Sequence, residues 1–288
     1  MPTIRANASP MERLPGIITA MILLVSSSNS YADGDLVTKT NEPPNLSKDV
    51  FNFVRIKYDS IGGRNESWYY FEDRVWQRWE TDYPRAGQNL MFRFSQLTSI
   101  KVNPEPVIIR LTDKALQKHP FIYMSDVGWM TLSVHEREAL KDYLENGGFL
   151  WVDDFWGQAE WNNWEYESTR ANPEWKWQDI SPKHPIMSTV FPLKKCPQIP
   201  ARSFFVKTGS HIDPHWVHRQ PNGGESDLEQ LHFRGLFDSK GRLMAIATHN
   251  TDIADGWERE GEGKEYFDTF SVDAYAFAIN VLTYVMTH

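Results

Sequence analysis

Cysteine is almost absent from the sequence, because Cys196 is the only one in 288 residues. A single thiol cannot form a disulfide within the chain, so stability must come from a packed core. A lone cysteine is more often a small buried hydrophobic residue than a nucleophile. Cys196 also lies in Lys-Lys-Cys-Pro, without the Gly-rich turn that presents a catalytic thiol. We therefore expect a buried, structural Cys196.

Runs of basic residues are also lacking. The net charge is −8 and the pI is near 5.6, whereas a nucleic-acid-binding protein normally has a basic face. We therefore expect no nucleic-acid partner. No transmembrane segment is expected after the first 32 residues, since the carboxy-terminal apolar stretch is interrupted by Asp273 and Asn280.

The first residues have the features of a secretion signal. Arg5 and Arg13 precede a short apolar run at 17–25, which is too short to span a bilayer as a helix. Ser30-Tyr31-Ala32 supplies the small residues of a cleavage site. We predict a signal peptide over 1–32, a polar linker over 33–48 and export to the periplasm or the exterior. A disordered start is the alternative.

The remaining residues, 49–288, predict one α/β domain. Ser133 with Glu136 forms a capping box at the start of a helix, and Gly147-Gly148 ends that helix before a buried strand. Hydrophobic patterning predicts strands at 51–58, 107–109, 121–124 and 149–152, a hairpin at 233–248, and helices at 86–100, 133–146, 156–170 and 270–286. This alternation favours an open, mainly parallel sheet with helices on both faces.

Several separated motifs carry a resemblance to a known family. They are Phe53–Asp59, Asp82-Tyr83-Pro84, Asn89-Leu90, Leu140–Trp156, His184-Pro185, Gly241-Arg242, His249–Glu258 and Met286–His288. The chain resembles, over about residues 50–288, an uncharacterised bacterial domain of unknown function that is often exported. The resemblance implies a flavodoxin-like fold of the class I glutamine amidotransferase-like type, and it implies no activity.

Amidotransferases of that fold carry their nucleophilic cysteine six residues after the second Gly of the Gly-Gly turn. In this chain the same count from Gly148 reaches Asp154, within Val-Asp-Asp-Phe-Trp. The cysteine elbow is therefore absent, and amidotransferase activity is excluded. The position remains the usual ligand crevice of an open α/β sheet.

Two strand-end motifs are the candidate site. The first holds Asp153, Asp154 and Trp156; adjacent strand residues face opposite ways, so at most one Asp is expected on a given wall. The second supplies candidate ligand-binding residues at Asn250, Asp252, Asp255, Trp257 and Glu258. Asp252 and Asp255 are also candidate ligands of a divalent cation. Purely structural roles, as helix caps or in a self-bonded turn, are the alternative for both motifs.

Two classes of function follow from these motifs. One is a ligand-binding or assembly module of the cell envelope, whose acids and tryptophans would hold an envelope glycan or a protein partner. The other is a hydrolase of an envelope glycan or peptide, acting with or without a metal ion, with Asp154 as nucleophile or base and His184 or His249 as its partner.

Overall fold

The computed structural model describes residues 49–211, 228 and 230–288. The predicted signal peptide and linker lie outside these residues. The central sheet has seven strands, and their bounds are β1 Val54–Ile56, β5 Val107–Ile109, β6 Phe121–Ser125, β8 Phe149–Phe155, β9 Trp177–Asp179, β10 His232–Phe237 and β11 Leu243–His249. Two small antiparallel sheets pair β2 (Asp59–Ser60) with β7 (Met130–Thr131), and β3 (Trp68–Phe71) with β4 (Arg74–Gln77).

The central sheet has the strand order β5-β1-β6-β8-β11-β10-β9. The first five strands in this order pair in parallel, and β10 runs antiparallel to both β11 and β9. The prediction of a mainly parallel α/β sheet is therefore confirmed. Strand β8 lies in the middle, so its carboxyl end is flanked by those of β6 and β11.

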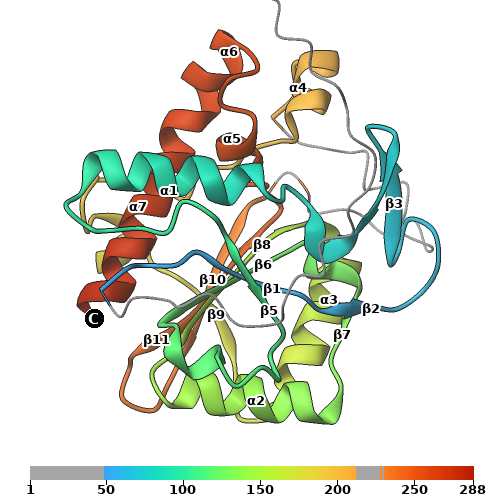
Figure 1. Ribbon diagram of the computed structural model, residues 1–288, viewed down its shortest axis with the longest axis vertical. Helices are drawn as coiled ribbons and strands as arrows, with labels where there is room; N and C mark the ends of the chain where they lie inside the picture. The colour runs from blue at the N-terminus through green and yellow to red at the C-terminus, as the bar shows by residue number, and fades with distance from the viewer. Residues whose placement is uncertain (1–48, 212–227, 229) are drawn as a thin grey trace, which may run out of the picture. The chain divides into compact units, whose positions relative to one another are not determined.

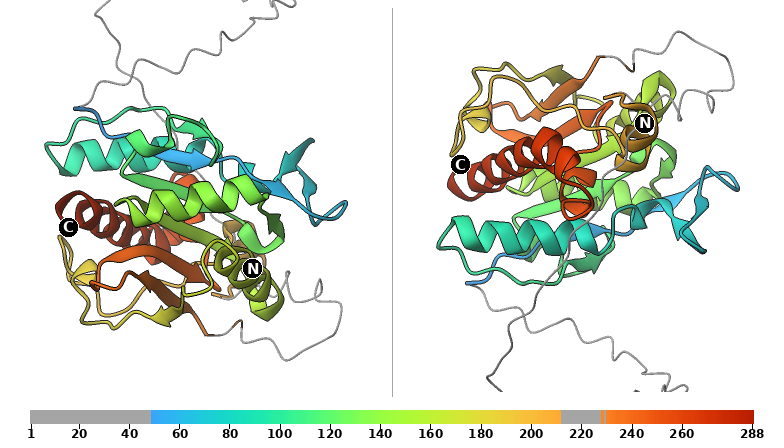
Figure 2. Two further views of the ribbon diagram at one scale, coloured as in Figure 1. Left: turned by 90° about the horizontal axis from the view of Figure 1, so that it is seen from below. Right: turned by 90° about the horizontal axis from the view of Figure 1, so that it is seen from above.

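Helices cover both faces of this sheet (Figure 1). The α-helices are α1 Arg85–Leu97, α2 Val134–Glu145, α3 Gly157–Thr169, α4 Arg202–Thr208, α5 Asp255–Glu258, α6 Lys264–Tyr266 and α7 Val272–Thr287; the η elements are the 3-10 helices η1 Arg78–Glu80, η2 Leu116–Lys118, η3 Val127–Trp129 and η4 Pro185–Met187 and the π-helix η6 Phe267–Ser271. Helices α1 and α7 share one apolar cluster with the sheet, and α2 and α3 share another. Both views of Figure 2 show α1 and α7 side by side.

The turn from α2 into β8 follows the predicted signals. The Ser133 hydroxyl accepts a hydrogen bond from the Glu136 amide at 3.3 Å, and the Glu136 carboxylate accepts one from the Ser133 amide at 2.9 Å. At the other end Gly147 has φ +104°. A Cβ on Gly148 would lie 2.4 Å from the ring of Tyr143, so only glycine fits there. This turn returns the chain so that β8 pairs with β6.

Strand β1 differs from the expected alternation of buried and exposed residues. All three of its residues are buried, because helices cover both faces of the sheet. Arg55 is only 1% exposed. Its guanidinium donates to the carbonyl of Trp79 at 2.8 Å and to that of Thr81. Arg55 thereby fixes the segment between β4 and α1, which reaches the candidate site.

The helical run Lys264–Thr287 is long and apolar enough to span a membrane by length and composition, among the described residues. The most apolar 18-residue stretch of this run is 61% buried inside the protein. Phe277, Ala278 and Val281 are fully buried against the sheet. Such burial is typical of a core helix, and the test of length and composition does not distinguish a core helix from a membrane span.

Candidate functional site

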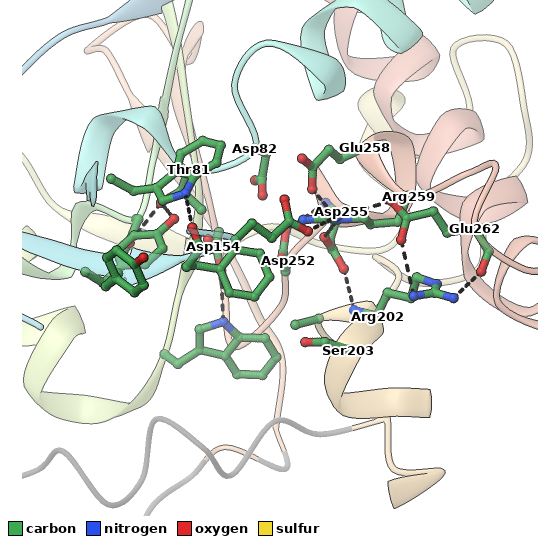
Figure 3. A pocket seen from close by; sticks show the side chains of 18 of the residues that line it. Thr81, Asp82, Asp154, Arg202, Ser203, Asp252, Asp255, Glu258, Arg259 and Glu262 are labelled. Carbon is green, nitrogen blue, oxygen red and sulfur yellow. Dashed lines mark hydrogen bonds and ion pairs between the residues drawn. The ribbon is translucent and has the colours of Figure 1, made fainter. Parts of the chain in front are cut away.

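A cavity of about 350 Å³ opens beyond the carboxyl ends of β6 and β8. Its walls come from the β3–β4 hairpin, the loop before α1, the strand ends, and the first residues of α4 and α5. The carboxyl groups that line it include Asp82, Asp126, Asp154, Asp252, Asp255 and Glu258, and the aromatic rings are Tyr69, Tyr70, Phe71, Trp76 and Trp156. Figure 3 shows that the acids come from separate segments of the chain.

Asp154 lies on the cavity wall near the end of β8. Its φ of +56° is a left-handed conformation, which Asp adopts more readily than most residues. One carboxylate oxygen, Oδ1, accepts a hydrogen bond from the Trp156 indole at 3.2 Å. Burial raises the pKa of Asp154 well above its usual value, and the negative charges of Asp82 and Asp126 raise it further.

Asp153 does not line the cavity, and its carboxylate faces Tyr123 of β6 and Thr248 of β11. Its oxygens accept hydrogen bonds from the Thr248 hydroxyl at 2.5 Å, the Tyr123 hydroxyl at 3.1 Å and the Ala254 amide at 3.0 Å. Burial raises its pKa to about 7. Asp153 therefore joins three chain segments behind the site, which corrects the expectation that it contacts a ligand.

Asp252 and Asp255 lie where the chain leaves β11 and begins α5. The Asp255 amide donates to Asp252 Oδ1 at 2.8 Å. Asp255 Oδ2 in turn accepts from the Tyr266 hydroxyl at 3.2 Å and from the Arg202 amide. Burial is the largest cause of the raised pKa values of both carboxyl groups. The sequence placed these two acids in the crevice, and both line the cavity.

Glu258 closes the same acidic wall. It is 5% exposed and forms an ion pair with Arg259 at 2.6 Å. Burial and the nearby Asp255 raise its pKa to about 7, although Arg259 opposes that rise. Glu258 and Trp156 are two further predicted ligand-binding residues that line the cavity.

Asp82 is a site residue that sequence reasoning missed. It precedes α1, has φ +65° and is 8% exposed. Carboxylate oxygens of Asp82, Asp252 and Asp255 lie within 4.8 Å of one another, which makes these three residues a candidate cation site. Burial, Glu258 and Asp255 all raise the pKa of Asp82. Asp82 belongs to the Asp82-Tyr83-Pro84 motif that contributed to the family resemblance. No local pattern in the sequence, however, shows that Asp82 faces Asp252.

The aromatic rim was also missed, because the stretch from Trp68 to Trp79 has no clear period. It folds into the β3–β4 hairpin, where the rings of Tyr69 and Trp76 stack 6.4 Å apart. Tyr70 at the rim is 55% exposed. Beneath the hairpin, Arg78 pairs with Asp126 at 2.6 Å, and the side chains of both are buried.

Three of the predicted site residues lie in the protein interior instead of the cavity. Asn250 Oδ1 accepts from the Gly157 amide at 2.7 Å and so fixes the start of α3. Trp257 is fully buried, 5.4 Å from Trp151 in an edge-to-face contact. His249 is fully buried with its ring 4.9 Å from that of Phe155. These placements correct the expectation of crevice roles for Asn250, Trp257 and His249.

His184 lies at the opposite end of the parallel strands from Asp154. Its ring is 5.9 Å from that of Phe237, and Phe237 pairs with Leu243 at the amino end of β11. Its Nδ1 accepts from the Ile186 amide at 3.3 Å, which caps η4. The structure therefore corrects the prediction that His184 is a partner of Asp154. Cys196 is buried, as expected.

A family model for a domain of unknown function, DUF4159, matches residues 53–286. The chain belongs to this family. The match includes every described strand and all of the acids that line the cavity. A search of curated proteins finds no match.

Proposed function

We propose that this member of the DUF4159 family is a ligand-binding module that takes a hydroxyl-rich ligand, such as an envelope glycan, into the strand-end cavity. The observation that carries the proposal is the pairing of an acidic wall with an aromatic rim around one cavity of about 350 Å³. Ligand sites are usually concave, with apolar walls and a few polar groups that fix orientation.

The two walls suit the two kinds of surface on a sugar. Carboxyl groups such as Asp154 and Asp252 accept hydrogen bonds from hydroxyl groups. Exposed rings such as Tyr70 and Phe71, at 55% and 40% exposure, offer flat apolar faces to the C–H groups of a sugar ring. A glycan would therefore lie between the hairpin and the acids.

A flavodoxin-like, amidotransferase-like scaffold is part of this proposal. Numbered along the chain, the five parallel strands have the order 2-1-3-4-5, which is the flavodoxin-like order. Asp154 replaces the cysteine of the amidotransferase turn, so the scaffold would retain the binding crevice without the thiol chemistry. We also propose export to the periplasm or the exterior, on the sequence of residues 1–32.

Hydrolysis of an envelope glycan or peptide is the second candidate function. It is favoured by the strained strand-turn-helix geometry at Asp154, with φ +56° before α3, which resembles the turn that presents nucleophiles in α/β-hydrolases. The raised pKa of Asp154 suits the predicted role of general base, because a base accepts protons best when its pKa is not far below the working pH. Neither His184 nor His249 lines the cavity, so a second carboxyl group would have to act as the partner.

The binding proposal is tested with two matched exposed tyrosines. Tyr70 and Tyr166 are 55% and 59% exposed, but only Tyr70 lines the cavity. Thermal unfolding and calorimetry with envelope glycan fragments, in EDTA, would be compared for the wild type, Tyr70→Ala and Tyr166→Ala. We expect glycan to raise the unfolding temperature by mass action, and Tyr70→Ala alone to weaken binding. Equal binding by both variants, or none by the wild type, would contradict the proposal.

The enzyme alternative has its own readout. Release of reducing ends or free amines from the same fragments would be followed for the wild type and for Asp154→Asn. Turnover that Asp154→Asn abolishes would establish the hydrolase. Binding without turnover would leave the binding module as the function.

A further inference from the structure

The cavity contains a group of three carboxylates from two distant segments of the chain. Asp82 comes from the loop before α1, whereas Asp252 and Asp255 flank the start of α5 (Figure 3). All three are buried, and one oxygen of each lies within 4.8 Å of the others. Two ligands on opposite sides of a Ca²⁺ ion are about 4.8 Å apart, since Ca²⁺–O distances are about 2.4 Å. We propose that Asp82, Asp252 and Asp255 bind a divalent cation.

The Asp82 side chain provides an independent reason to place a ligand there. Its Oδ2 is buried and accepts no hydrogen bond from the described residues. The side chain is aimed into the cavity, and the residue as a whole is 8% exposed. A buried carboxylate oxygen without a partner loses the energy of its hydration, so native proteins rarely retain one. A cation between Asp82 and Asp252 would supply the missing partner.

The other two carboxylates are already held in place. Asp252 Oδ1 accepts from the Asp255 amide at 2.8 Å, and Asp255 Oδ2 accepts from the Tyr266 hydroxyl at 3.2 Å. Such outer contacts orient the ligands of metal sites and raise their affinity. Asp82 is held through its backbone, because Arg55 binds the carbonyls of Trp79 and Thr81 just before it.

The charge around the three acids also favours a cation. Asp154 and Glu258 line the same cavity. Arg259 pairs with Glu258 at 2.6 Å and with Asp255 at 3.5 Å, and Arg85 pairs with Glu258 at 3.6 Å. Among the described residues, eight carboxyl groups line the cavity against two guanidinium groups, those of Arg202 and Arg259, so ionised carboxylates would repel one another. Oxygen-only ligands select Ca²⁺, Mg²⁺ or Mn²⁺ over the softer metals.

A cation at this point would join the loop before α1 to α5 and so order one wall of the cavity. The cation site lies in the same cavity as the proposed glycan site, and the inference rests on the proposed function in this respect only. A cation can bind whether or not a glycan does, so the two are tested separately.

The test uses the folded protein after EDTA treatment and dialysis, titrated with CaCl₂, MgCl₂ or MnCl₂ alone at constant ionic strength. Calorimetry and thermal unfolding would be measured for the wild type, Asp82→Asn and Asp142→Asn. Asp142→Asn is the matched control, since it removes one equal charge from an exposed position on α2. Asn also tolerates the left-handed backbone of Asp82, so the variant should fold.

We expect at least one of the three cations to bind the wild type with one ion per chain and to raise its unfolding temperature. Asp82→Asn should weaken that affinity about tenfold or more, because loss of even an outer contact of a metal ligand costs 10–100-fold. Asp142→Asn should leave it unchanged. If none of the three cations binds at concentrations up to about 10 mM, the proposal is overturned. That concentration is above the dissociation constants of the weakest calcium-binding modules. Equal affinity of Asp82→Asn and the wild type would overturn the proposal as well.

Glycan binding in EDTA separates this result from the proposed function. Loss of cation binding with glycan binding retained rejects only the cation site. Cation binding without glycan binding rejects only the proposed ligand. If an organic ammonium compound binds and none of the three metal ions does, the metal site is also overturned. The acids would then bind the charged group of an organic ligand.

Discussion

Replacing Asp153 by Asn should make the protein less sensitive to pH. Burial raises the pKa of Asp153 to about 7, against an unfolded value near 3.9. The folded state therefore holds this proton to a higher pH than the unfolded state does. Its contribution to stability is fully present below about pH 4 and is lost as pH rises through about 7. At about 1.4 kcal/mol for each pKa unit, the loss is about 4 kcal/mol.

The variant can keep the hydrogen bonds of the site. The Asn carbonyl oxygen would accept from the Ala254 amide and the Tyr123 hydroxyl, as Asp153 Oδ2 does now. Its NH₂ would face the Thr248 hydroxyl, which can accept that bond and donate instead to the Val152 carbonyl, 3.1 Å away. The three present partners of Asp153 each keep a hydrogen bond, so folding is expected. The second N–H of the new amide lacks an acceptor among these groups, and that cost is the same at every pH.

Urea unfolding at pH values from about 5 to 8, in EDTA, measures the effect. Asp82 and the other acids of the cavity contribute their own pH dependence to both proteins, so the difference between them is the informative quantity. We expect the unfolding free energy of the wild type to fall more steeply than that of Asp153→Asn, by about 3 kcal/mol, because only the two pKa units between pH 5 and about 7 lie within this range. Parallel curves for the two proteins would refute the reasoning, since Asp153 would then be ionised at little cost.

Three further outcomes are expected. Arg78→Met should lower the unfolding free energy measured in urea by about 3–5 kcal/mol, because Asp126 would lose the buried ion pair at 2.6 Å. A loss below 1 kcal/mol would contradict this. Gly148→Ala should lower the unfolding temperature by an amount equivalent to about 1–3 kcal/mol, since its Cβ would lie 2.4 Å from the ring of Tyr143. Gly261→Ala, whose Cβ would meet nothing within 4 Å, is the control. Cys196 should react with thiol reagents only on unfolding, because burial raises its pKa, and fast labelling of the native protein would argue against this.

Local patterns in the sequence determined most of the elements around the site. The capping box at Ser133 and the Gly147-Gly148 turn specify the end of α2 and the start of β8, because these signals act within a few residues. The same local reasoning identified Asp154 at a strand end. The acids of the Asp252–Glu258 stretch also follow directly from the end of β11.

Only the tertiary structure decided which of these side chains share a cavity. Asp82 meets Asp252 and Asp255 because α1 packs beside α5, a contact between segments far apart in the chain. His184 packs on Phe237 near the amino end of β11, so it lies at the opposite end of the strands from Asp154. Trp257 follows an acidic motif like Trp156, yet it turns into the core against Trp151. Sequence spacing fixes the position of a residue on its own element, whereas the packing of elements fixes what that residue faces.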